Sequence, residues 1–158
     1  MDKGHVKKGT KNPGEAKSLL GKSETRFNYF KDKEITEKDA SIIFENLYGA
    51  IREATQSLMS FKGYKPYSHE ATISFLKEFY SKKFSEEELN KFDRFRILRS
   101  DSEYRAVPVT KEDAESCLEF AKTFIKKVKL MHNTIEETNG ENKENLKKES
   151  KNKKTKKN

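Results

Sequence analysis

The sequence predicts an all-α protein, an up-and-down bundle of about five helices. Three segments each place a hydroxyl residue three positions before an acid, a pattern typical of helix starts. The stretches that follow repeat apolar residues at steps of three and four, which puts those residues on one side of a helix. No strand-like alternation of apolar and polar residues accompanies a hairpin turn, so helices account for the pattern.

The helix starts divide the chain into five segments. The three strongest starts are Thr36 with Asp39, Ser85 with Glu88, and Thr110 with Asp113. Weaker starts stand at Asn12, which precedes a proline, and at Ser68. The expected helices cover residues 13–33, 37–62, 69–82, 86–102 and 111–132. Because the links are short, we expect neighbouring helices to pack antiparallel.

The helix at 37–62 is apolar on more than one side. Ile43, Ala50 and Met59 lie off the stripe that starts at Phe44 and ends at Phe61. A helix that is apolar over a wide arc is either central in its own bundle or buried against a second subunit. The sequence leaves both possibilities open.

The charge pattern divides the chain into a bundle and two tails. The net charge is +8, and all of the excess lies at the two ends, each of which is poor in apolar residues. We therefore expect a disordered basic head over 1–12, a helical domain over 13–133 and a disordered Lys-rich tail over 134–158. Such a tail either serves as a solvated segment or attracts RNA or DNA without specificity.

Several function classes are not supported. The chain has no glycine-rich phosphate loop, no paired-cysteine metal site and no His-Glu-x-x-His pattern, so we expect no cofactor and no metal. No apolar run is long enough to span a membrane, and the N-terminus lacks the apolar stretch of a secretory signal. The single cysteine, Cys117, lies on an apolar stripe. These features are typical of a cytoplasmic protein.

The three histidines are far apart in the sequence, and each has a local interpretation. His5 lies in the basic head. His69 lies in the first turn of an expected helix, after the cap Ser68. His132 lies at the end of the last expected helix, where a cation is favoured.

The arginines are the main candidates for a binding site. The chain has 28 lysines and six arginines, yet four arginines fall within twelve residues: Arg94, Arg96, Arg99 and Arg105. Arginine offers a planar fork that binds a carboxylate or phosphate through two hydrogen bonds. Arg96 and Arg99 share one helix face. The alternative is internal pairing with the neighbouring acids Asp93, Asp101 and Glu103.

Two stretches of the sequence resemble a known family. Residues 47–54 and 61–71, with the turn Gly-Tyr-Lys-Pro-Tyr-Ser-His, look like the second and third helices of HEPN domains (higher eukaryotes and prokaryotes nucleotide-binding). Residues 97–106, followed by the capped helix from Thr110, look like the fourth and fifth. The resemblance covers roughly residues 15–130 and implies a helical bundle that usually dimerises.

The resemblance also implies an activity whose signature this chain carries only in part. Active members are metal-independent ribonucleases, with an Arg, a polar residue and a His four to six positions beyond the Arg. Arg99 and Ser100 match the first two positions, but residues 103–106 contain no His, and Tyr104 is the nearest substitute. A tyrosine titrates near 10, whereas histidine titrates near 6.5 and can exchange protons at neutral pH.

The resemblance and the arginines together favour a nucleotide- or RNA-binding module that is not catalytic by itself. Its candidate ligand-binding residues are Arg96, Arg99, Tyr104 and Arg105. The resemblance implies a homodimer and a nucleotidyltransferase partner, as in toxin–antitoxin pairs or substrate-binding subunits. One alternative is a ribonuclease in which Arg99 stabilises the phosphate and Tyr104 or His69 moves the proton. Another is a scaffolding bundle in which Arg99 pairs with Glu53 or Asp101.

A joint role for Arg99 and Tyr104 requires the helix to end early. Five positions apart, they point away from one another on a continuous helix and converge only if the helix ends after about Asp101. Ser100 and Ser102 are weak helix formers, and Pro108 disfavours helix at the residue before it. We therefore expect a loop in which Tyr104 folds back beside Arg99.

Overall fold

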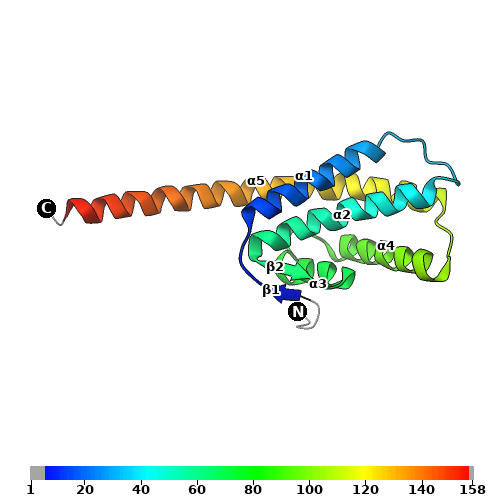
Figure 1. The fold of residues 1–158 in the computed structure, drawn as a ribbon, viewed down its shortest axis with the longest axis horizontal. Coiled ribbons are helices and arrows are strands. Elements are labelled where there is room, and N and C mark those ends of the chain that lie inside the picture. The colour runs from blue at the N-terminus through cyan, green and yellow to red at the C-terminus, as the bar shows by residue number, and fades with distance from the viewer. Residues whose placement is uncertain (1–5, 157–158) are drawn as a thin grey trace.

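The computed structural model describes residues 6–156, which form five helices and two short strands. The helices are α1 (Pro13–Phe30), α2 (Ala40–Lys62), α3 (His69–Phe79), α4 (Glu86–Arg105) and α5 (Lys111–Thr155). Helices α1 and α4 run in one direction, and α2 and α5 run in the other (Figure 1). The predicted all-α bundle is confirmed. Within the described residues, no helix combines the length and apolarity that a membrane span requires.

Local hydrogen bonds set the helix starts. At Ser85 and at Thr110, the hydroxyl accepts from the amide three residues later, at 3.1 Å in both cases. The acid at that later position accepts in turn from the amide of the hydroxyl residue, at 2.8 and 2.9 Å. Both predicted capping boxes are therefore confirmed. At the third predicted start, Thr36 caps a separate turn, and α2 begins at Ala40.

Helix α2 is the central helix of the bundle. The other four helices all pack against it (Figure 1). The three residues that lie off its main apolar stripe, Ile43, Ala50 and Met59, are buried within the chain itself. The wide apolar arc of α2 is thus covered by its neighbours, and this pattern needs no second subunit.

The basic head differs from the disorder expected over residues 1–12. Strand β1 (Val6–Lys8) pairs antiparallel with β2 (Tyr64–Pro66), which follows α2. Gly9 N–H also donates to the carbonyl of Gly63, a residue whose φ of 77° turns the chain at the end of α2. Backbone hydrogen bonds make these contacts, so the polar composition of the head gives no sign of them. The first five residues lie outside the described part of the chain.

Helix α5 continues to Thr155, past the end expected at residue 132 and through most of the tail expected to be disordered. Beyond Glu136, every described residue is exposed, and no hydrogen bond or ion pair joins this segment to the bundle. The extension projects from the bundle (Figure 1). Local backbone hydrogen bonds and good helix formers such as Lys and Glu account for its helical form. An isolated helix of this kind is marginal in water, so we still predict that its removal costs the bundle little stability.

Candidate ligand-binding site

Helices α2, α3 and α4 bring a phenol, an imidazole and two guanidinium groups together. Tyr48 from α2 is almost fully buried, and the His69 ring from the start of α3 stacks on it, with centroids 5.7 Å apart. Tyr48 Oη lies 3.0 Å from His69 Nδ1, and Arg52 Nη1 lies 2.5 Å from His69 Nε2. Arg99 from α4 lies over the Tyr48 ring, with its Cζ 5.9 Å from the ring centroid. Tyr48 thus contacts both Arg99 of α4 and His69 of α3.

The hydrogen bonds and the electrostatics of this cluster agree on a neutral histidine. Arginine can only donate, so His69 Nε2 accepts from Arg52, and Nδ1 carries the hydrogen that it donates to Tyr48 Oη. Burial, followed by the charges of Arg52 and Arg99, lowers the pKa of His69 to about 4. Burial raises the pKa of Tyr48 to about 12. At neutral pH, two uncharged rings therefore lie among guanidinium cations.

Arg99 is paired inside the chain, although with partners other than the two proposed for a scaffold. Its guanidinium lies 3.0 Å from Glu103 and 3.5 Å from Glu45. A hollow of about 200 Å³ opens beside it, lined also by Ser41, Phe44 and Ser102. The Arg99 guanidinium therefore borders a small surface hollow on one side and the Tyr48 ring on the other.

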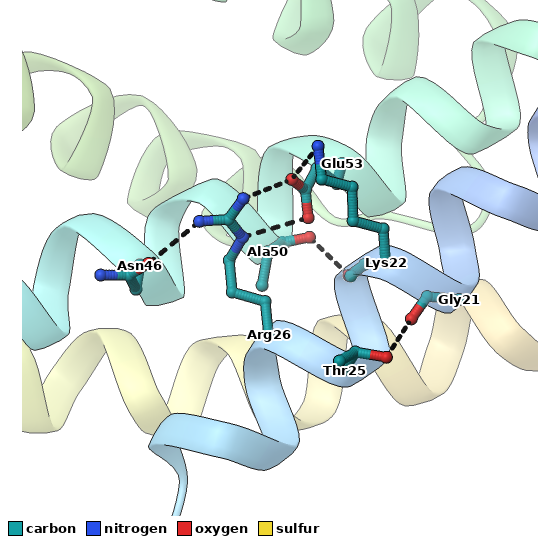
Figure 2. Close-up of polar contacts among 8 residues, drawn as sticks. Gly21, Lys22, Thr25, Arg26, Asn46, Ala50 and Glu53 are labelled. Carbon is teal, nitrogen blue, oxygen red and sulfur yellow. Dashed lines mark hydrogen bonds and ion pairs between the residues drawn. The ribbon is translucent and has the colours of Figure 1, made fainter.

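Glu53, one of the proposed scaffold partners of Arg99, pairs with Arg26 of α1 instead. Arg26 donates to both carboxylate oxygens, at 2.8 and 3.3 Å, and to the side-chain oxygen of Asn46 at 2.9 Å (Figure 2). Lys22 adds a longer ion pair at 3.6 Å. This network links α1 to the central helix and leaves the Glu53 carboxylate buried but satisfied.

Arg96 and Arg105 are paired with the acids that the sequence offered for internal pairing. Arg96 Nε donates to Asp93 at 2.7 Å, and Arg105 lies 3.9 Å from Asp101 with a side chain that is 78% exposed. Arg96 acts electrostatically on both rings of the cluster, whereas Arg105 lies at the solvent end of α4. Arg96 and Arg99, which were predicted to share one helix face, therefore both act electrostatically on His69, whereas Arg105 is exposed to solvent.

Tyr104 does not fold back beside Arg99. Helix α4 continues to Arg105, so Tyr104 is 78% exposed while the Arg99 side chain is 23% exposed. The expected break after Asp101 is wrong, because the helix ends at Ala106 in a left-handed conformation with a φ of 53°. The amides of Ala106 and Val107 both donate to the Asp101 carbonyl, which holds the last turn closed.

The remaining candidates for chemistry are buried. His132 is 3% exposed and bonded to Ser57 Oγ at 2.7 Å, and burial lowers its pKa. The cationic role expected for His132 at a helix end is wrong, because α5 continues past it and the ring is buried against Ser57 and Phe61 of α2. Cys117 is a core residue, as predicted. Among residues 6–156, no cluster of three acid, histidine or cysteine side chains is arranged to hold a metal ion.

The comparison with family models decides the family. Residues 16–131 match the HEPN domain model, which covers most of the chain and all but the ends of the bundle. The chain belongs to the HEPN domain family. No curated protein gives a significant match. In this HEPN domain, the window that follows Arg99 reads Glu-Tyr-Arg-Ala at 103–106 and contains no histidine.

The sequence identified the arginine-bearing helix α4 of this HEPN domain, but it did not single out Tyr48 or Arg52 and did not place His69 beside them. Arg52 has no arginine near it in the sequence, so a search for clustered arginines does not select it. His69 was interpreted as a residue of a first helical turn and, in the ribonuclease alternative, as a distant proton carrier. The turn Gly-Tyr-Lys-Pro-Tyr-Ser-His, which carried the family resemblance, contains His69 and was the one signal that pointed to it.

Proposed function

We propose that this HEPN domain is a nucleotide- or RNA-binding module that is not catalytic by itself. The observation that carries the proposal is the convergence of Arg52, Arg96 and Arg99 from two helices on Tyr48 and His69. Guanidinium groups bind phosphate oxygens through paired, charge-assisted hydrogen bonds. Membership of a family that is generally associated with nucleotides and RNA supports the same ligand class.

The position and protonation of the candidate proton carriers support a binding role. Tyr104 lies on a different face of α4 from Arg99 and has no proton partner among the described residues. His69 is close to Arg99 through Tyr48, but with a pKa of about 4 it is a weak base at neutral pH. A general base works best when its pKa lies near the working pH.

A metal-independent ribonuclease is the second candidate, and one observation favours it. His69 stacks on the Tyr48 ring and Arg99 lies over the same ring, so an imidazole lies close to the arginine although the sequence separates them. This candidate predicts cleavage of single-stranded RNA in the presence of a chelator, lost in both Arg99→Gln and His69→Gln. Absence of cleavage by the wild type would exclude the ribonuclease and leave the binding role as the proposed function.

The binding role is tested with a single-stranded RNA oligonucleotide and with AMP. We expect Arg99→Gln to weaken binding by about tenfold, the effect of losing one charge-assisted pair. Arg94→Gln is the matched control, because Arg94 is exposed on the same helix and forms no ion pair within the described residues. Absence of binding to either probe would favour the scaffolding alternative, in which internal pairs with Glu45 and Glu103 are the whole role of Arg99.

The proposal includes a homodimer formed along α4. Ile97 and Tyr104 are seven positions apart, so they share one face of this helix, and they are 44% and 78% exposed. Such a pair of exposed apolar side chains on the arginine-bearing helix favours self-association. Light scattering at micromolar concentration tests it, and a mass of 18.4 kDa would contradict it.

A nucleotidyltransferase is the proposed protein partner. Family membership is the support, because such domains often work beside a transferase, as toxin–antitoxin pairs or as substrate-binding subunits. A transferase gene next to this one and co-purification of the two proteins are the expected findings. Failure of the two proteins to associate when co-expressed would contradict this partner.

A further inference from the structure

The six arginines differ in how their charges are compensated. Four of them have a carboxylate within 4.0 Å: Arg26, Arg96, Arg99 and Arg105. Arg94 is exposed, so water solvates its charge. Arg52 is half-buried, and among residues 6–156 no carboxylate pairs with it. It is the one arginine of the described chain that is withdrawn from water without an acid to balance it.

The polar contacts of Arg52 leave part of its guanidinium unused. Its one hydrogen bond within the described residues goes from Nη1 to the neutral imidazole of His69. Its Nε is buried and has no hydrogen-bond partner. A buried donor without a partner costs roughly 1–3 kcal/mol, and an uncompensated charge costs more. An anion that binds the guanidinium would compensate this charge.

The surroundings of Arg52 favour an anion over a cation. Arg99 and Arg96 lie close enough to influence His69 electrostatically, and His69 itself lies in the first turn of α3, where a helix carries a partial positive charge. The acids that face the cluster are Glu103 and Glu45, which pair with Arg99, Asp93, which pairs with Arg96, and the exposed Glu70 beside His69. These acids leave Arg52 itself unpaired.

We propose that Arg52 and His69 form a binding site for a phosphate group, completed by Arg99, which lies over the Tyr48 ring. A phosphate offers several acceptor oxygens, so it can take hydrogen bonds from Arg52 and Arg99 at once. If His69 takes up a proton, its Nε2 donates to the phosphate in place of accepting from Arg52, which frees Arg52 Nη1 to donate to the phosphate as well. Binding therefore draws a proton onto His69. The site depends on the proposed function only for the source of the phosphate, which is a nucleotide monoester or an RNA diester.

Nuclear magnetic resonance of the histidine side chains tests the site, with inorganic phosphate as the probe. In the free protein, His69 stays neutral at mildly acidic pH, so its Cε1–H resonance moves little there. Phosphate should shift this resonance toward the protonated position and raise the pKa of His69. The His132 resonance should stay unchanged, because that ring lies in the core bonded to Ser57.

Three variants separate this site from general attraction of anions to a basic protein. Arg52→Gln should weaken the phosphate response of His69 by at least about tenfold, and Arg52→Lys, which keeps the charge without the fork, should restore it only in part. Arg94→Gln removes the same charge at an exposed position and should respond as the wild type does. Circular dichroism checks that each variant is folded.

The result that overturns the site is a phosphate response of His69 that is equal in the wild type, Arg52→Gln and Arg94→Gln, or absent in the folded wild type. AMP and the dinucleoside phosphate ApA then distinguish a monoester from a diester, because ApA carries only an internal phosphate. RNA binding that survives Arg52→Gln but not Arg99→Gln would overturn this site and leave the proposed function standing. Phosphate binding without any nucleotide or RNA binding would overturn the proposed function and leave this site standing.

Discussion

Removal of the Arg26 guanidinium tests the buried network that joins α1 to α2. Glu53 is 6% exposed, so Arg26→Met leaves a buried carboxylate with only the 65% exposed Lys22 at 3.6 Å (Figure 2). Breaking a buried pair costs about 3–5 kcal/mol, and the remaining lysine reduces this to about 2–3 kcal/mol. The expected fall in the melting temperature is roughly 6–12 °C. Thermal and urea denaturation at neutral pH, followed by circular dichroism, measure it.

Two further variants check the reasoning for this network. Lys22→Met removes the exposed partner of the same carboxylate and should cost less than about 1 kcal/mol. The double variant with Arg26→Met and Glu53→Leu removes both charges and should be more stable than Arg26→Met alone. The reasoning fails if Arg26→Met costs no more than Lys22→Met, or if adding Glu53→Leu destabilises the protein further.

Three other predictions follow from the fold. Truncation after Glu137 should leave the melting temperature nearly unchanged, and limited proteolysis should remove the same segment first. A large loss of stability would contradict the claim that this part of α5 has no support from the bundle. Ala106→Gly should raise the free energy of unfolding by about 0.5–1 kcal/mol, because Ala106 has a left-handed φ of 53°; a loss of stability in urea denaturation would count against this. Burial lowers the pKa of His69 and His132, so the unfolded chain takes up protons first: stability should be full above about pH 6.5 and fall as the pH drops toward about 4. The urea midpoint measured against pH should show this slope, and an equal slope in His69→Gln would contradict the contribution of that residue.

The features predicted correctly from the sequence are those set by local interactions or by periodicity. The boxes at Ser85 and Thr110 need only residues three positions apart, so their hydrogen bonds follow from the sequence. The spacing of the apolar residues in α2 is enough to predict that they are buried. What covers that arc depends on how the chain folds back, and there the sequence left two possibilities open.

The features that were missed depend on contacts through space or on the backbone. Arg52 and His69 are 17 positions apart, and the His69 ring reaches Arg99 only through Tyr48, so no sequence spacing joins them. The pairing of β1 with β2 uses backbone groups that every residue carries. The weak helix formers Ser100 and Ser102 predicted an end after about Asp101, but α4 continues to Arg105 and ends at Ala106, a residue type that rarely adopts the left-handed conformation.

A map of RNA binding across the chain tests the central claim most directly. Uniformly labelled protein is titrated with a short single-stranded RNA, and changes in backbone amide and histidine side-chain resonances are assigned to residues. We predict that the largest changes lie around Tyr48, Arg52, His69 and Arg99, on α2, α3 and α4. Changes confined to the Lys-rich extension at 143–154, with this cluster unmoved, would contradict the claim and assign RNA binding to non-specific attraction by the tail.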